Sequence, residues 1–278
     1  MITYGAMPSF LQLLRQGGAV RSNYRGESVP VGAGFFLIWV GCISGPLLLL
    51  PFPSGLSFLY FPTGSPFLYI ILFTTTALGY GLLGLLDDLV GSRRETGLKG
   101  HGLALKQGRL TSGAVKALVG ATFGLAMTGY RLRVVGSFPG QWPLVLCIDG
   151  LLIAASANTL NLLDLRPGRA GKAFLFGSLL LILTGSPLSL LLLPWMGSLV
   201  GYLPFDLRGE AMMGDVGSNA LGALLGLTCC CGFSLTAKCL LLLGLIFLHI
   251  LAERVSFSNI IDNYPLLRTL DAWGRKDS

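Results

Sequence analysis

Long apolar stretches that carry almost no charge are the feature that most constrains this chain. A helix needs roughly 20 apolar residues to cross a bilayer. Of the 278 residues, 53% are hydrophobic and only 12% are charged, whereas soluble domains carry about 25% charged residues. The stretches cover residues 31–52, 67–86, 113–130, 143–163, 173–205, 217–237 and 239–252. The composition therefore predicts an integral membrane protein.

The stretch 173–205 is too long for one span, and Gly185-Ser186-Pro187 is a natural turn inside it. Dividing it there gives about eight spans. We therefore predict an all-α, polytopic transmembrane helix bundle that forms a single membrane domain over residues 1–278. Its parts are a cytoplasmic amphipathic segment and loop (1–30), the transmembrane bundle (31–252) and a cytoplasmic tail (253–278).

The positions of Lys and Arg predict the orientation, because cytoplasmic loops hold the excess of basic residues. With the N-terminus inside and eight alternating spans, all of the 20 basic residues except Arg131, Arg133 and Lys238 fall on the cytoplasmic face. Both termini are then cytoplasmic. Topology and anionic lipid explain the net charge of +7, so we expect no nucleic-acid partner. The opening MITYGAMPSF lacks a signal-peptide pattern, so we expect the first spans to direct insertion.

Both ends of the chain are predicted to touch the membrane surface. Residues 7–20 have an amphipathic pattern, and the tail carries Leu266, Leu270 and Trp273 among charged residues. For the tail, a surface anchor is favoured over a catalytic role.

The first candidate site element is the pair Asp87 and Asp88, where the second stretch ends in GLLGLLDDLVGS. Adjacent carboxylates near a bilayer repel each other and are costly to desolvate. A divalent cation relieves both costs, and oxygen ligands suit Mg²⁺ next to a phosphate-bearing substrate. The alternative is an ordinary helix end with two solvated carboxylates.

The second element is SANTLNLLDLRPGR, in which Asn158, Asn161 and Asp164 recur at every third residue. Steps of three drift by only about 60° around a helix, so the three side chains share one arc. Asn side chains also join membrane helices by hydrogen bonds, which is the structural alternative. The functional interpretation is favoured because this polar face runs to the same end as Asp87 and Asp88.

The third element is MMGDVGSNALG, with Asp215 between two glycines just ahead of a span. We expect Ser218 to be the N-cap of that helix. Free N–H groups at a helix start attract phosphate, and Gly214 permits close approach of the backbone. The alternative is an ordinary helix-capping turn.

Basic partners are expected from the loop that holds Lys99, Lys106 and Arg109 and from Lys116. Lys116 lies a few residues inside a span, where an unpaired charge is costly, so it is predicted to face the polar cluster. Snorkelling to the interface is the alternative.

Other polar residues are predicted to be structural. The six cysteines and the histidines His101 and His249 have no metal-ligand spacing. Asp149 lies apart, in the outer half of its span, where a proton or ion pathway would want a carboxylate. A solvated or helix-bonded carboxylate is the favoured interpretation.

In their order and spacing, these elements and the earlier segment AVRSNYRGESVPVGAG resemble the polyprenyl-phosphate N-acetylhexosamine-1-phosphate transferase superfamily, glycosyltransferase family 4. The resemblance implies transfer of a sugar 1-phosphate from a UDP-sugar to a polyprenyl phosphate, with release of UMP and a need for Mg²⁺, or Mn²⁺ in its place. It implies that Asp215, Asp87 and Asp88 lie at the metal, and that Asp87, Asp88 and Asp164 are catalytic. The substrate-binding residues that it implies are Lys116, Asn158, Asn161, Gly214 and Ser218.

The chain also departs from that family's pattern. Where the family continues Asp-Gly-Leu-Asp-Gly, this chain reads Asp164-Leu165-Arg166-Pro167-Gly168, so Pro167 replaces an acidic residue linked to nucleotide recognition. The family's histidine-rich loop has no counterpart in 253–278, and we expect its first span to be missing. The metal half of the site is recognisable, and the nucleotide-sugar half is altered.

The leading hypothesis is an enzyme at the inner face of the bacterial cytoplasmic membrane, acting in peptidoglycan or envelope polysaccharide synthesis. The alternative is a non-catalytic family member that binds polyprenyl phosphate or a nucleotide sugar as a regulator or scaffold. Transport is disfavoured, because transporters place polar groups near the midplane. The Gly222 and Gly226 spacing permits close helix packing, which includes packing in a homodimer.

Overall fold

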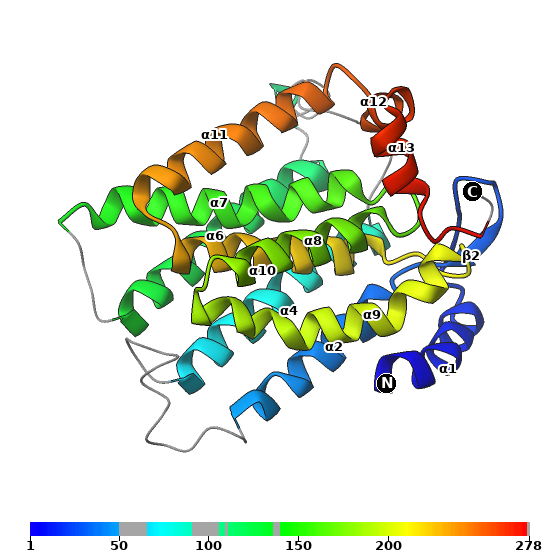
Figure 1. Cartoon of the computed structure of the whole chain (residues 1–278). Coiled ribbons are helices and arrows are strands. Elements are labelled where there is room, and N and C mark those ends of the chain that lie inside the picture. Colours follow the sequence, from blue (N-terminus) through cyan, green and yellow to red (C-terminus); the bar gives the residue numbers. More distant parts are fainter. Residues whose placement is uncertain (50–65, 91–105, 109–110, 136–139, 277–278) are drawn as a thin grey trace.

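The computed structural model describes residues 1–49, 66–90, 106–108, 111–135 and 140–276. Within them the chain is almost entirely helical, and its longer helices lie roughly side by side (Figure 1). The elements before residue 140 are α1 (Ile2–Gln16), β1 (Val20–Ser22), β2 (Ser28–Pro30), α2 (Gly34–Ser44), η1 (Pro46–Leu49), α4 (Pro66–Val90) and α6 (Ser112–Val135). Those that follow are α7 (Trp142–Leu163), α8 (Arg169–Leu183), η2 (Pro187–Leu192), α9 (Leu193–Leu207), α10 (Gly214–Gly232), α11 (Leu235–Ala252), α12 (Phe257–Asn263) and α13 (Pro265–Ala272). The predicted class, an all-α membrane protein, is confirmed.

In the described part of the chain, each of the eight predicted stretches contains a helix. Within the described part of the chain, four are long and apolar enough to cross a membrane, namely Pro66–Leu89, Trp142–Leu163, Leu188–Leu207 and Leu235–Ala252. The other helices are shorter, as α2 is, or less apolar, so the count of eight spans stays a prediction. The predicted division of 173–205 is confirmed, because α8 ends at Leu183 and Gly185 turns the chain with a φ of 75°.

Helix α10 lies in the middle of the bundle, where it packs against α7, α4, α2 and α8 (Figure 1). Two glycines let α7 approach it closely. A Cβ at Gly222 would lie 2.4 Å from the carbonyl oxygen of Ser156, and one at Gly226 would lie 2.8 Å from the Cα of Ile153. This small-residue pair therefore packs within one chain, and a homodimer remains a prediction without that support.

A short hairpin, which sequence reasoning treated only as a loop, ties the N-terminal region to the start of α10. Strands β1 and β2 pair antiparallel, and the Asn23 side chain closes their turn by accepting the N–H groups of Arg25 and Glu27. The chain after β2 then pairs with Met212, whose N–H donates to the Pro30 carbonyl at 2.8 Å. The hairpin is thereby fixed beside the segment that leads into α10.

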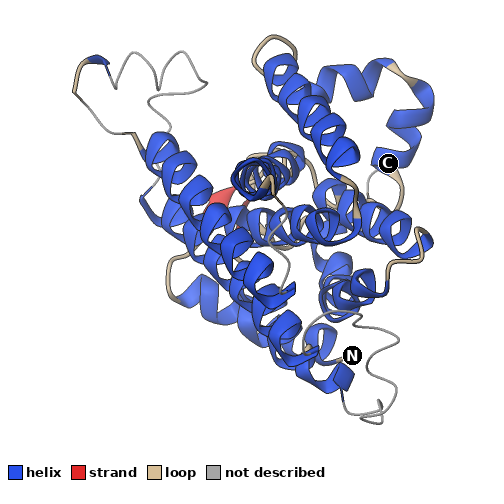
Figure 2. Ribbon diagram, turned by 90° about the vertical axis from the view of Figure 1, so that its left-hand side faces the viewer, coloured by secondary structure: helices blue, strands red, loops and turns tan. Residues whose placement is uncertain are grey.

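The ends of the chain differ in how they pack. Helix α1 buries Met7 and Leu11 and contacts α9 and α2, so its apolar face is used inside the protein. The tail forms two short helices, α12 and α13, which Figures 1 and 2 show at the edge of the bundle near the end of α11. Leu266 and Leu270 of α13 and Trp273 just after it are exposed, and their predicted place at a membrane surface remains a prediction.

Candidate active site

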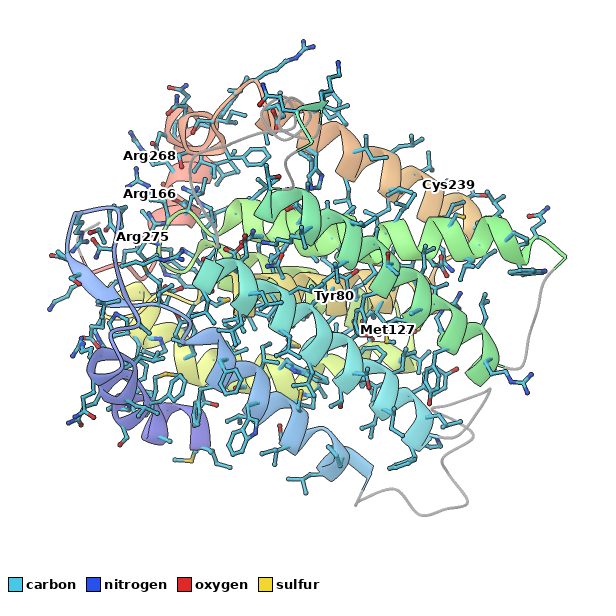
Figure 3. The ribbon with its side chains drawn as sticks, turned by 180° about the vertical axis from the view of Figure 1, so that it is seen from behind. Tyr80, Met127, Arg166, Cys239, Arg268 and Arg275 are labelled. Carbon is cyan, nitrogen blue, oxygen red and sulfur yellow. The ribbon has the colours of Figure 1, made fainter. Side chains whose placement is uncertain are left out.

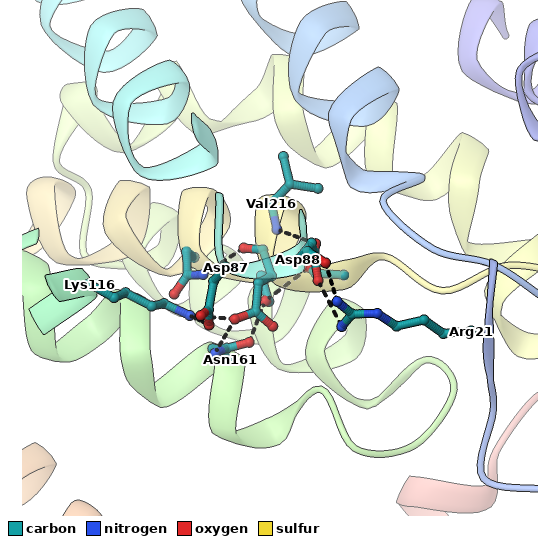
Figure 4. Close-up of polar contacts among 10 residues, drawn as sticks. Arg21, Asp87, Asp88, Lys116, Asn161 and Val216 are labelled. Atoms are coloured by element: carbon teal, nitrogen blue, oxygen red, sulfur yellow. Dashed lines mark hydrogen bonds and ion pairs between the residues drawn. The ribbon is translucent and has the colours of Figure 1, made fainter. Parts of the chain in front are cut away.

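Five polar side chains from four helices meet at one end of the bundle (Figure 4). Asp87 and Asp88 come from the last turns of α4, Lys116 from the first turns of α6, Asn161 from the end of α7 and Asp215 from the start of α10. A close helix crossing brings the carboxylates together, because a Cβ at Gly84 would lie 2.1 Å from the Asp215 carbonyl oxygen. The three elements found in the sequence therefore form one site.

Lys116 holds two of these carboxylates. Its ammonium donates to Asp87 Oδ2 at 3.2 Å and forms an ion pair with Asp215 Oδ2. Its side chain is only 17% exposed, so the predicted orientation toward the polar cluster is correct and snorkelling is not. Asn161 reinforces the arrangement, since its Nδ2 donates to Asp215 Oδ2 at 3.2 Å.

The sequence pattern predicted that Ser218 is the N-cap of α10, and this prediction is wrong. The helix begins one turn earlier, at Gly214, and Ser218 is fully buried inside it. Its hydroxyl donates to Asn161 Oδ1 at 2.9 Å and so orients the amide that contacts Asp215. Gly214 makes the earlier start possible, because its φ is 75° and a Cβ there would lie 2.6 Å from Asp88 Oδ2.

Asp88 occupies the N-terminal end of α10. The N–H of Val216 donates to Asp88 Oδ2 at 3.4 Å, which is the place where a free helix start attracts an anion. Arg21, from β1, donates to the Asp88 carbonyl oxygen and lies 3.6 Å from its carboxylate. Arg21 is a site residue that sequence reasoning missed, although it stands in the AVRSNYRGESVPVGAG segment.

Asp164 caps the C-terminus of α7 beside these groups. Burial, together with the charges of Asp206, Asp215 and Asp88, raises the pKa of its carboxyl well above the ordinary value. Burial likewise raises the pKa of Asp215, although the Lys116 ammonium opposes the shift. Asp206, another buried carboxylate that was not singled out, accepts the N–H of Gly168 at 2.8 Å.

Some predicted members lie elsewhere. Asn158 is exposed. In the described residues, it takes no part in the hydrogen bonds that join Asn161 to Asp215 and to Ser218. It lies 120° around α7 from Asp164, so the shared arc was too wide to bring all three together. Lys106 is exposed. Lys99, His101 and Arg109 lie outside the described residues.

Carboxyl groups and cations gather together at this site. Among the described residues, the carboxyl groups of Asp87, Asp88, Asp164 and Asp215 lie near the cations of Lys116 and Arg21. Within the described ranges no group of three or more His, Cys, Asp or Glu side chains is already gathered as a metal site. The Lys116 ammonium lies between Asp87 and Asp215, which shows that a cation fits between them. Carboxylate oxygens are also the donors that Mg²⁺ prefers.

Asp149 belongs to a second, separate cluster. It is completely buried and forms ion pairs with Arg131 of α6 and with Lys238 of α11, whose Nζ is 3.1 Å away. Of the two alternatives in the favoured interpretation, the carboxylate bonded to a neighbouring helix is confirmed and the solvated one is wrong. The partners themselves were not predicted, because they come from distant parts of the sequence. His249 is structural, as predicted: its Nδ1 bonds the Leu245 carbonyl at 2.7 Å. All six cysteines are free.

Comparison with known proteins identifies the family of this chain. Residues 69–232, more than half of the chain, match glycosyl transferase family 4. The chain therefore belongs to glycosyl transferase family 4, and the resemblance inferred from the motifs is confirmed.

Several relatives carry the name phospho-N-acetylmuramoyl-pentapeptide-transferase. That of Desulforamulus reducens is 30% identical over 229 residues, which are 78% of this chain and 64% of the relative. That of Chlamydia trachomatis serovar L2 is 32% identical over 186 residues, 60% of this chain and 53% of the relative. That of Desulforudis audaxviator is 26% identical over 251 residues, 86% and 72% of the two chains. The chain spans about half the length of the chlamydial relatives that it matches.

Proposed function

We propose that this protein transfers a sugar 1-phosphate of the N-acetylhexosamine type from a UDP-sugar to a polyprenyl phosphate and releases UMP. The observation that carries the proposal is the meeting of Asp87, Asp88, Lys116, Asn161 and Asp215 at one end of an apolar bundle. Membership of glycosyl transferase family 4 and the names of the relatives support this class of reaction. The process served is peptidoglycan or envelope polysaccharide precursor synthesis in bacteria.

The reaction joins two phosphates, so cancelling charge is its main demand. An oxygen of the lipid phosphate attacks the β-phosphorus of the UDP-sugar, the bond from that phosphorus to UMP breaks, and UMP leaves. Lys116 neutralises phosphate charge, and Asp87 or Asp88 orients or activates the lipid phosphate. Asn161 and Asp164 line the nucleotide-sugar side. Fixed charges of this kind supply most of the catalysis in phosphoryl transfer.

Magnesium is part of the proposal. Asp215, with Asp87 and Asp88, would hold the ion, which supplies positive charge to the phosphates when bound. The position of the Lys116 ammonium supports this assignment, because it shows that a cation fits between Asp87 and Asp215. Chelation with EDTA is expected to remove activity, which added Mg²⁺ restores, with Mn²⁺ as a substitute.

The proposed setting is the bacterial cytoplasmic membrane, with about eight spans, cytoplasmic termini and the carboxylate site at the cytoplasmic face. The distribution of Lys and Arg supports this orientation. Labelling of cysteines introduced at Leu13 and Leu266 with a membrane-impermeant reagent in intact cells tests it. Both sites are exposed on the protein, and both are expected to react only after the cells are opened.

The test of activity is UMP release by detergent-purified protein with undecaprenyl phosphate, Mg²⁺ and a panel of UDP-N-acetylhexosamines that includes UDP-N-acetylmuramoyl-pentapeptide. The Asp215→Asn variant is the blank. Release above this blank supports the transferase and identifies the donor. Binding of lipid phosphate without release from any donor favours the non-catalytic alternative, to which the Pro167 departure points.

A further inference from the structure

The connection between α7 and α8 is held by contacts that the proposed function does not use. Each of four consecutive residues contacts a different partner: Arg166 lies 4.9 Å over the ring of Tyr24, the Pro167 carbonyl accepts from Arg275, Gly168 donates to Asp206, and Arg169 binds Asp271. Two of these partners, Asp271 and Arg275, come from the C-terminal tail. Asp164 stands two residues before Arg166, so these contacts fix the backbone next to a proposed site residue.

The contact between Asp271 and Arg169 is bidentate and buried. Arg169 Nε donates to Asp271 Oδ1 at 2.7 Å and Nη2 to Oδ2 at 2.9 Å. The two side chains are 6% and 8% exposed, so water screens this pair less than a surface ion pair. Arg275 adds a second cation 2.8 Å from Asp271 Oδ2, and its Nε donates to the Pro167 carbonyl at 2.9 Å. Asp271 therefore joins the tail to α8 and to the loop.

Lys172 completes the attachment at the end of α13. Its ammonium donates to the backbone carbonyls of Leu270, Asp271 and Trp273 at distances of 3.0, 2.6 and 3.1 Å. These carbonyls lack helical partners at a helix C-terminus, where a cation is favourable. Figure 3 shows Arg166, Arg268 and Arg275 at the same end of the molecule, with Cys239 far along α11.

Apolar packing does not explain the attachment. Neither α12 nor α13 contains a buried residue, and Leu266 and Trp273 are mainly exposed. The polar contacts with Arg169, Lys172 and Pro167 thus decide where the tail lies.

We propose that Asp271 is a positioning residue of the transferase site, which fixes the 164–168 connection through Arg169 and Arg275 and so holds Asp164 beside Asp215 and Asp88. This role rests on the proposed function. With this role, the tail positions the site in addition to its predicted function as a surface anchor. Loss of the Asp271 charge would leave Arg169 buried without its bidentate partner and free the loop to shift.

The test combines hydrogen–deuterium exchange with steady-state kinetics on the full chain. Asp271→Asn removes the charge at nearly constant size, and Asp271→Glu keeps it. Asp262→Asn makes the same change at an exposed carboxylate of α12 and is the matched control. Exchange is read from peptides over 164–169, whose protected amides include Gly168, and rates are normalised to folded protein from size-exclusion chromatography.

We expect Asp271→Asn to raise exchange over 164–169 and to lower kcat about tenfold or more while KM changes less than about twofold, because misplaced groups slow the chemical step. Asp271→Glu should recover part of both losses, and Asp262→Asn should match the parent protein. Unchanged exchange in Asp271→Asn, or raised exchange with unchanged kcat, would overturn the proposal. If the parent protein transfers no sugar phosphate, the role falls with the proposed function, and raised exchange then reports only a structural clamp.

Discussion

Two clusters of charged residues inside the bundle use their carboxylates in opposite ways. At one end, Asp87, Asp88 and Asp215 lie near the Lys116 ammonium and the Arg21 guanidinium, and Asp87 and Asp215 remain 24% and 28% exposed. At the other cluster Asp149 is fully buried between Arg131 and Lys238. The first cluster is partly exposed to solvent, whereas the three side chains of the second cluster are all buried.

This difference distinguishes a candidate functional site from an ion cluster that stabilises the fold. Helix α11 is mostly exposed, and its buried residues are Lys238 and Leu242, so the Asp149 contact is a main attachment of α11 to the bundle. Buried ions matter for stability when one partner is removed. A partly exposed cluster of carboxylates can instead exchange its counter-ions for a metal and phosphates. We therefore expect mutations in the first cluster to change activity and mutations in the second to change stability.

The largest effect is expected from Asp215→Asn. Loss of the carboxylate that contacts both Lys116 and Asn161 should lower UMP release by about 10³-fold or more, a scale typical for loss of transition-state charge stabilisation. Thermal unfolding should change little, since the asparagine oxygen can still accept from Asn161. Activity within about tenfold of the parent protein would remove Asp215 from the proposed site.

Asp149→Asn should have the opposite profile. It leaves two buried cations without a carboxylate, which costs about 3–5 kcal/mol of stability. UMP release per folded molecule should stay near that of the parent protein. Unfolding in detergent, followed by circular dichroism, measures the first quantity. Arg133→Gln, at an exposed arginine of the same helix end as Arg131, is the control.

The triple variant Asp149→Leu, Arg131→Leu, Lys238→Met sharpens this prediction. Replacing a complete buried ion cluster by apolar side chains is often neutral or stabilising. Recovery of stability in the triple variant would indicate that the cluster serves only to stabilise the fold. Loss of sugar-phosphate transfer in a stable triple variant would contradict the distinction between the clusters.

Gly222→Ala should affect both properties, but less strongly. The new Cβ would lie 2.4 Å from the Ser156 carbonyl oxygen, so α10 must move away from α7. We expect a cost of about 1–3 kcal/mol, typical of overpacking, and lower turnover because Asp215 and Asn161 lie on these two helices. Gly244→Ala on α11, where nothing lies within 4 Å, is the control and should be neutral.

The smallest effect concerns the pH dependence of the tail contact. Burial raises the pKa of Asp271, but the hydrogen bond from Arg169 and the charges of Arg169 and Arg275 outweigh it, so its pKa lies below the usual range. The contact therefore adds full stability above the ordinary carboxyl pKa of about 4 and loses it as the pH falls further. The difference in Tm between the parent protein and Asp271→Asn should thus be present at pH 7 and shrink below about pH 4. A difference that grows at low pH would contradict the assignment.

The features that the sequence predicted best are those that depend on a local residue pattern or on the length of an apolar stretch. The helices over the eight stretches, the turn at Gly185 and the inward direction of Lys116 follow from hydropathy and from the cost of unpaired charge. Asp87, Asp88, Asn161 and Asp215 could be grouped because each stands at the same end of its stretch.

Contacts between distant segments escaped prediction. In the sequence, Arg131 and Lys238 stand out only because they are basic residues on the predicted outer face. The fold shows that both form ion pairs with Asp149. Ser218 fits an N-cap pattern, but Gly214 lets α10 start a turn earlier. The docking of Asp271 on Arg169 joins residues far apart in the sequence through a tail without apolar packing, and no periodicity signals it.

The most direct measurement of the central claim is mass spectrometry of the lipid product. Purified protein is incubated with undecaprenyl phosphate, Mg²⁺ and each UDP-N-acetylhexosamine, with Asp215→Asn and Asp149→Asn in parallel. The account predicts an undecaprenyl diphosphate sugar with the parent protein and with folded Asp149→Asn, and none with Asp215→Asn. Lack of this product with every donor, or equal product with Asp215→Asn, would contradict the claim that the carboxylate cluster is a transferase site.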